Sequence, residues 1–126
     1  VEDLQRLTYA AEQSGASADA AANGLKFLQK NASEAASGPG AAADAFRSLG
    51  VSVKDANGNI RPTTDIMADV ADGFVKLPEG AQRTAAAMAV FGRAGVDLVP
   101  LLAGGAQGVR ELALEAEDLG IVFSQE

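Results

Sequence analysis

Apolar residues along most of the chain recur at the three- and four-residue spacing of amphipathic helices. The first such stripe runs over residues 4–11, and it predicts a helix that Gly15 ends. A second helix is predicted to begin after Ser17 or Asp19, either of which can cap it, and to end at the Ser37–Gly40 tetrad. The pattern of the first third of the chain is therefore helical.

A short third stripe occupies residues 42–49, and Gly50 is placed to end that helix. A fourth helix, expected to be capped by Thr63 or Thr64, has the clearest pattern in the chain, with one face formed by Ile66, Val70, Phe74 and Leu77. Pro78 is expected to open a fifth helix. Two more follow between glycines, Val96–Ala103 and Ala106–Leu119.

The periodicity changes between Val51 and Arg61. Two brief strands are predicted there, joined at Asn57-Gly58, which is the strongest short signal for a hairpin turn. A two-residue turn and a longer turn with a glycine bulge would pair different residues, and the sequence leaves both open.

Together these elements predict an all-α fold, a compact domain of about seven short helices with one small β-hairpin insert near residues 51–61. The 126 residues correspond to one domain. Its predicted core contains Phe46, Ile66, Phe74, Met88, Phe91 and Leu101.

The composition makes this core thin. Hydrophobic residues form 48% of the chain, but 27 of them are alanine, and there are five Phe, one Tyr and no Trp. Each alanine buries little more than one methyl group, so helix packing must be close. Cysteine and histidine are absent, which excludes disulfides, thiolate nucleophiles, Ser-His-Asp relays and imidazole metal sites.

The formal net charge is −7, and the ten basic residues are scattered singly. A net acidic surface repels phosphate backbones and anionic lipids, so binding to nucleic acid or to a membrane is not expected. The longest uncharged run, Leu98–Val109, is too short to span a bilayer.

Three patterns could carry chemistry, and each has a simpler structural interpretation. Asp55, Asn57 and Asn59 imitate the opening of a calcium loop, but Ile60 and Ile66 stand where such a loop needs glycine and glutamate. Turn formation by Asp and Asn is the simpler interpretation. We therefore expect no metal site.

The other two patterns are a glycine-rich corner and a pair of acidic stripes. Residues 104–108 could present free N–H groups to an anion, although a helix–helix corner is the simpler interpretation. Carboxylates at helical spacing could do acid–base work or bind a cation, but a solvated helix face is the usual role. The two stripes are Asp65/Asp69/Asp72 and Glu111/Glu115/Asp118. We expect no catalytic residues and no cofactor.

Four blocks of sequence, in order, resemble the phage tail tape measure protein family. The main block is Ala45–Pro62, and a second contains Arg83-Thr84-Ala85 followed by Phe91–Gly95. Leu98–Leu102 and Gly105–Gly108 follow in the expected order. The resemblance covers about residues 36–120, whereas residues 1–35 form a low-complexity helical lead-in.

The motif positions that this resemblance singles out are structural rather than catalytic. They are Phe46, Leu49, Gly50, Val51, Val53, Asp55, Asn57, Gly58, Phe91, Gly92, Gly95, Pro100, Gly105 and Gly108.

The resemblance implies a non-enzymatic virion component that templates the length of the tail tube and leaves the tube when DNA is ejected. It implies residence in the tube lumen, after assembly in the bacterial cytoplasm. It also implies contacts with the tail tube protein and tail assembly chaperones, and self-association as a small parallel bundle. Members are much longer, so the chain is expected to be one module of a longer protein.

Two other interpretations remain open at this point. One is a generic helical interaction domain of a secreted or surface-delivered bacterial protein. The other is a peptidoglycan-cleaving accessory domain. The sequence argues against it, because it has no acidic residue surrounded by the aromatic residues that would form a sugar-binding groove.

Overall fold

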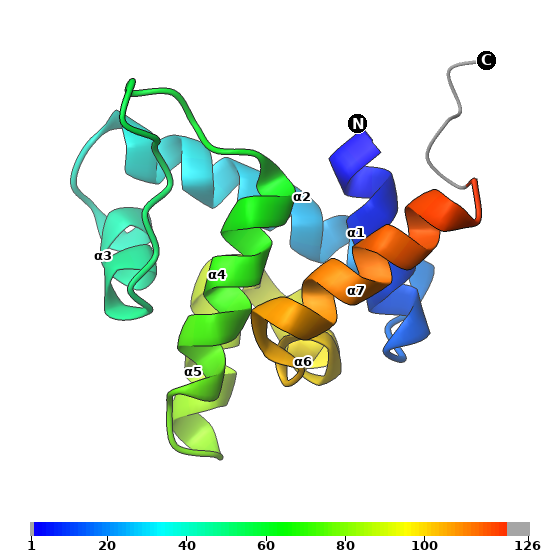
Figure 1. Cartoon of the computed structure of the whole chain (residues 1–126). Helices are drawn as coiled ribbons and strands as arrows, with labels where there is room; N and C mark the ends of the chain where they lie inside the picture. Colours follow the sequence, from blue (N-terminus) through cyan, green and yellow to red (C-terminus); the bar gives the residue numbers. More distant parts are fainter. Residues whose placement is uncertain (1, 121–126) are drawn as a thin grey trace.

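The computed structural model describes residues 2–120, and its elements are helical (Figure 1). The helices of the first half are α1 (Glu2–Gln13), α2 (Ala18–Ser37) and α3 (Ala41–Ser48). Those of the second half are α4 (Thr63–Val75), α5 (Ala81–Phe91), α6 (Gly95–Leu102) and α7 (Gly105–Asp118), with a 3₁₀ turn, η1 (Gly92–Ala94), between α5 and α6. The all-α prediction is confirmed.

Helices α4 and α7 lie side by side at the front of the molecule in Figure 1, and α1 packs on the other side of α7. Helix α2 runs behind them, where it contacts α1, α3, α5 and α6. Helix α3 and the connection that follows it form one edge of the molecule. Helix α6 contacts α2, α4 and α7, so it lies between the front and the back of the fold.

The predicted hairpin at residues 51–61 is wrong, since no strand occurs in the described part of the chain. A single antiparallel bridge joins Lys54 to Ile60. The ladder stops there because the Asp55 carboxylate accepts the N–H groups of Asn57 and Asn59, at 2.9 and 3.0 Å. These local hydrogen bonds replace the pairing that strands would need.

The prediction of seven separate short helices is also not supported, because α5, η1 and α6 follow one another without an interruption. Residues 2–120 thus contain six uninterrupted helical runs. The run Ala81–Leu102 is long and apolar enough to cross a membrane by length and composition. It is not one straight helix in this structure, because Gly92 has φ +70° and α6 folds back onto α5.

The core joins side chains from each of the elements α1 to α7 and from the 51–53 segment. Phe46, Phe74 and Phe91 are its largest fully buried side chains. One predicted core position is wrong, because Met88 is 43% exposed. The buried side of α5 is formed by Ala87, Val90 and Phe91, and Met88 lies outside that face.

Helix ends follow the sequence in part. Ser17 caps α2 by accepting the N–H of Ala20 at 3.0 Å, and Gly50 has φ +75° just after α3, as predicted. Pro78 does not open α5, which begins three residues later behind Gly80. Neither Thr63 nor Thr64 caps α4 as predicted, because Pro62 occupies the N-cap position and Thr63 is already the first residue of the helix.

Two glycines let backbones approach more closely than any side chain would permit. A Cβ placed on Gly73 of α4 would lie 2.2 Å from the backbone oxygen of Leu49. One placed on Gly95 would lie 2.3 Å from the backbone oxygen of Ala87. Neither neighbour can rotate away, because both contacts are with main-chain atoms.

We expect Gly73→Ala to destabilise the fold by about 1–3 kcal/mol, because the added methyl group overpacks a backbone contact. Gly108→Ala is the matched control, since Gly108 is also helical but has open space around its Cβ position. That change should stabilise the protein by about 0.5–1 kcal/mol through helix propensity alone. Urea unfolding measures both values, and equal effects of the two substitutions would contradict the packing described above.

Candidate functional surface around helix α4

The acidic stripe of α4 is the feature in the sequence with the most obvious potential for chemistry. In the structure its three carboxylates are separated by their partners rather than gathered into one site. Asp65, in the first turn, accepts a hydrogen bond from Arg110 of α7, with Oδ1 and Nη1 3.1 Å apart. Both side chains are partly exposed, so this ion pair joins the two helices at the surface.

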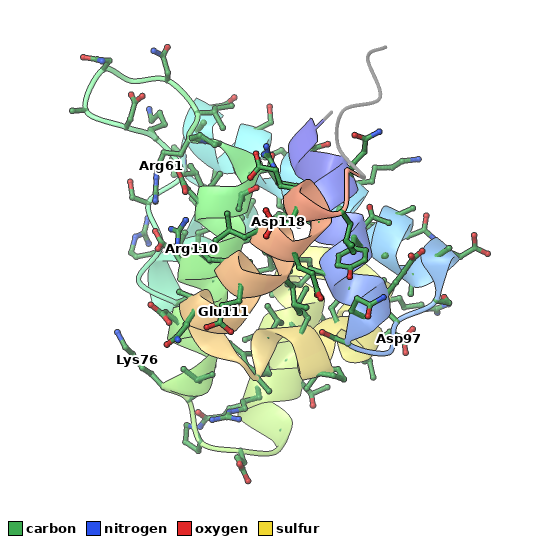
Figure 2. All side chains as sticks on the ribbon, turned by 45° about the vertical axis from the view of Figure 1, so that its right-hand side comes forward. Arg61, Lys76, Asp97, Arg110, Glu111 and Asp118 are labelled. Carbon is green, nitrogen blue, oxygen red and sulfur yellow. The ribbon has the colours of Figure 1, made fainter. Side chains whose placement is uncertain are left out.

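The second member of the stripe, Asp69, holds the connection between α3 and α4. Its Oδ2 lies 2.7 Å from Nη1 of Arg61, which also donates to the backbone oxygen of Ser52 at 2.7 Å. The Arg61 side chain is more buried than that of Arg110, with 23% of it exposed against 49% for Arg110. It therefore fastens the 51–62 connection onto α4 (Figure 2).

The third member, Asp72, caps a different helix. Its Oδ1 accepts the N–H of Ala106 at 2.9 Å, in the first turn of α7. The cap residue of α7, Gly104, provides no side-chain hydrogen bond of its own. Asp72 therefore occupies the place that an external anion could have taken at this glycine-rich corner, where negative charge is favoured.

The corner has the shape that this cap requires. Gly105 has φ +70°, and a Cβ placed on it would lie 3.4 Å from Asp72 Oδ1. The structure thus has a helix–helix corner between α6 and α7, in agreement with the simpler interpretation.

The second acidic stripe lies on the outer face of α7. Figure 2 shows Glu111 and Asp118 projecting from this helix. Glu111 accepts a hydrogen bond from the side chain of Gln107 at 2.9 Å. Desolvation raises the pKa of Tyr9 above its ordinary value, and its hydrogen bond to the Glu115 carboxylate and that carboxylate's charge raise it further. The stripe is a solvated face with local partners.

The carboxyl end of α4 is closed by Arg83, which sequence reasoning did not single out as a contact. Its Nε and Nη2 donate to the backbone oxygens of Leu77 and Val75, both at 3.0 Å. Its guanidinium lies over the ring of Phe74, 5.3 Å from the ring centre. A cation at this end of a helix satisfies carbonyls that lack partners within the helix.

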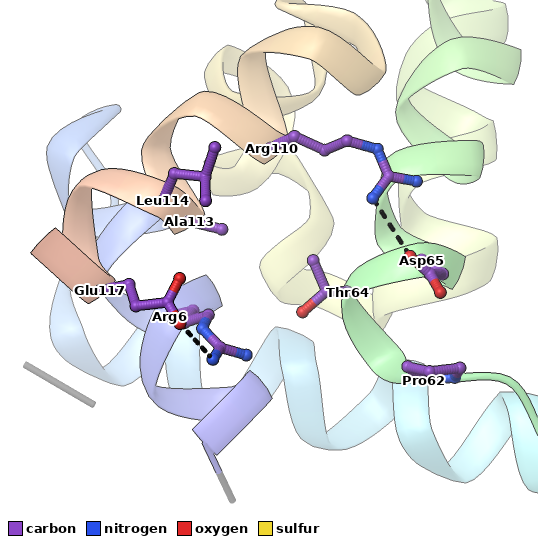
Figure 3. Close-up of a pocket in the computed structure, with 8 residues that line it drawn as sticks. All are labelled: Arg6, Pro62, Thr64, Asp65, Arg110, Ala113, Leu114 and Glu117. Atoms are coloured by element: carbon purple, nitrogen blue, oxygen red, sulfur yellow. Dashed lines mark hydrogen bonds and ion pairs between the residues drawn. The ribbon is translucent and has the colours of Figure 1, made fainter. Parts of the chain in front are cut away.

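A pocket of about 400 Å³ opens beside the start of α4, between α1, α4 and α7 (Figure 3). Two ion pairs stand on its opposite sides, Arg6 with Glu117 at 3.2 Å and Arg110 with Asp65 at 3.1 Å. Apolar walls lie between them, formed by Pro62, Ala113 and Leu114. The Thr64 hydroxyl is buried without a hydrogen-bond partner in the described part of the chain.

This pocket has no arrangement that resembles a catalytic centre. Each carboxylate in it is paired with an arginine, so neither is placed as a free base or as one of two facing acids. Among residues 2–120, no group of three potential metal ligands comes together. The geometry is that of a surface notch between three helices.

The calcium-like triad is turn chemistry. Asp55 Oδ1 points back to the N–H groups of its own loop, as described above, and is therefore occupied by the chain itself. The Gly58 N–H donates to the backbone oxygen of Asp55 at 3.0 Å, and Gly58 has φ +86°. This is the Asx-type turn that Asp and Asn favour.

The motif positions of the sequence fall into three structural groups. Buried side chains form the first group: Phe46, Leu49, Val51, Val53 and Phe91. Glycines that turn the chain at positive φ form the second: Gly50, Gly58, Gly92 and Gly105. The rest are the tight contact at Gly95, the loop residues Asp55 and Asn57, Pro100 within α6, and Gly108 within α7.

These positions do not converge on one site. They are distributed over α3, the following connection, and the segment from α5 to α7. The arginines that tie the elements together, Arg61, Arg83 and Arg110, were missed as contacts. Arg61 and Arg83 did stand inside or beside the motif blocks, which was the only available signal.

We expect Asp72→Ala to destabilise the protein by about 1 kcal/mol, because α7 loses its N-terminal cap. Asp118→Ala serves as a control, since it removes an exposed carboxylate at the other end of the same helix. The control should leave stability unchanged or raise it slightly, because negative charge is unfavourable at a helix C-terminus. Thermal unfolding followed by circular dichroism compares the two; similar losses in both variants would contradict the cap.

Comparison with known protein families identifies the chain over most of its length. The sequence profile of the family described as phage-related minor tail protein matches residues 2–92, well over half of the chain. The match includes the low-complexity lead-in and extends to the end of α5. Searches of curated proteins and of solved structures found no match.

This match and the distribution of the motif positions agree, because turns, tight contacts and buried side chains are what a structural component needs. The chain belongs to the phage-related minor tail protein family, and its role is that of a structural component of a phage tail.

Proposed function

We propose that this chain is a folded module of a tape measure protein, which fixes the length of the tail tube during assembly. The observation that carries the proposal is the ordered series of four blocks between Ala45 and Gly108, in a chain that belongs to a minor tail family. Those blocks supply the turns and the close contacts of the fold. The same residues that resemble the family thus shape the module.

The module itself is not the ruler in this proposal. One continuous helix of this length would extend about 190 Å, at 1.5 Å per residue. Here the same chain folds back on itself at Gly50, Gly92 and Gly105, so it spans only a fraction of that distance. We propose that the module accompanies an extended part of the same protein, in the lumen of the tail tube.

The partners proposed for the module are the tail tube protein, tail assembly chaperones and other copies of the same chain. The exposed side of α5 supports self-association, because it carries small or uncharged side chains. These are Ala81, Gln82, Thr84, Ala85, Met88 and Ala89. Small residues let helices of neighbouring copies approach closely, and the acidic faces of α4 and α7 would avoid retaining DNA.

The test is an in-frame duplication of the codons for residues 2–120 in the phage or prophage that encodes the chain. A residue-by-residue ruler made of helix would lengthen the tail by about 180 Å, at 1.5 Å per residue. The folded module should change the length by much less. Electron microscopy of the tails measures the difference.

A second arm tests the tape measure role itself. Deleting the whole reading frame that contains the chain should abolish tails of uniform length, because nothing then sets where tube growth stops. Tails of normal and uniform length in that deletion would contradict the proposal. A duplication that adds the full helical length would contradict only the folded-module part.

A further inference from the structure

The chain contains two Asn-Gly sequences, and the structure places them in opposite environments. Asn23-Gly24 lies within helix α2, whereas Asn57-Gly58 lies in the turn between the bridge residues Lys54 and Ile60. Asn-Gly is the dipeptide in which a backbone nitrogen most easily attacks the preceding side-chain amide, because glycine has no Cβ to obstruct the approach.

We propose that Asn57 is a site of spontaneous deamidation and that Asn23 is protected by the fold. The reaction needs no enzyme and no metal; its only co-reactants are a base and water. It would convert a structural turn of the virion protein into a chemically altered turn during ageing.

The reaction at Asn57 proceeds in two balanced steps. The Gly58 backbone nitrogen gives up its proton to hydroxide and forms a bond to Cγ of Asn57, the bond from Cγ to Nδ2 breaks, and ammonia leaves with a proton from water. The five-membered succinimide then takes up one water. Opening at one carbonyl gives aspartate, and opening at the other gives isoaspartate.

The turn leaves both reacting groups accessible. Asn57 and Gly58 are exposed, and nothing lies within 4 Å of the Cβ position of Gly58. The Asn57 side-chain amide makes no hydrogen bond within residues 2–120. The Gly58 N–H does donate to the Asp55 backbone oxygen at 3.0 Å, but this is a single bond in a surface turn that one isolated bridge closes.

Helix α2 prevents the same reaction at Asn23. The Gly24 nitrogen is bound into the helical ladder, and regular helical dihedrals hold it away from the side-chain carbon of Asn23. Gly24 is buried, and a Cβ placed on it would lie 2.5 Å from Leu98 Cδ1. Opening the helix here would therefore break the contact between α2 and α6.

The product would act on the loop that Asp55 organises. A carboxylate at position 57 adds a negative charge two residues from Asp55, whose Oδ1 accepts the N–H of Asn57. Isoaspartate also adds one atom to the main chain, so the turn that sets the Lys54–Ile60 bridge changes its length. The connection remains attached to α4 through Arg61 and Asp69.

The experiment incubates the folded chain at mildly alkaline pH and follows deamidation by tandem mass spectrometry of tryptic peptides. Trypsin places the two sites in separate peptides, residues 7–26 and 55–76. Asn59, followed by the bulky Ile60, is an internal control within the second peptide. A sample in concentrated urea gives the rates without the fold.

We expect the rate of deamidation at Asn57 in the folded protein to be at least about tenfold the rate at Asn23. A surface turn opens with a small free energy, whereas opening a helix packed in the core requires nearly the free energy of global unfolding. In urea the two rates should become similar. Asn57→Gln should remove the fast product, since its longer side chain forms a cyclic imide much less readily.

Equal slow rates at Asn57 and Asn23 in the folded protein, with both fast in urea, would overturn the proposal. That outcome would mean that the hydrogen bond from Gly58 to Asp55 locks the turn. Fast deamidation at Asn23 in the folded chain would contradict the protection by α2.

Discussion

The close approach of one backbone to another is the constraint on which this fold depends. Many of the buried side chains are alanines, and helices that bury such small side chains can exclude water between them only when their axes lie near each other. Gly73 meets that requirement where α4 passes Leu49, and Gly95 meets it where α6 passes Ala87. The three buried phenylalanines fill the spaces that remain between helices held at these distances.

Helix α4 joins most of the molecule through polar contacts around this packed centre. Its carboxylates hold the α3–α4 connection and two points on α7, and Arg83 closes its C-terminal end. The three carboxylates that could have formed a catalytic or cation-binding site instead accept hydrogen bonds from other parts of the same chain. The exposed faces are left with little specific chemistry, which suits a structural part of a tail.

Local sequence signals predicted those parts of the fold that depend on local physics. Ser17 and Gly50 stand where helix ends require a cap or a positive φ, and α4 follows its apolar stripe closely. The turn at Asn57-Gly58 was placed correctly, but its interpretation as a hairpin was wrong because the Asp55 side chain competed with strand pairing. Met88 was misplaced because α5 buries Ala87, Val90 and Phe91, and apolar spacing in an alanine-rich helix does not distinguish that face from the one that carries Met88.

The candidate surface was harder to predict, because its contacts join residues far apart in the sequence. Nothing near Asp72 indicates that it caps a helix beginning more than 30 residues later. The same is true of Arg110 and Asp65, which are separated by 45 positions. The family resemblance indicated a structural role at those positions without indicating which residues would touch.

The chain folds as a closed module rather than as one extended helix. Small-angle X-ray scattering of the 126-residue chain in solution tests it most directly. A compact monomer should have a radius of gyration of about 14 Å, the value that a folded domain of this length follows. A rod approaching about 190 Å in length, as expected for one continuous helix at 1.5 Å per residue, would contradict it.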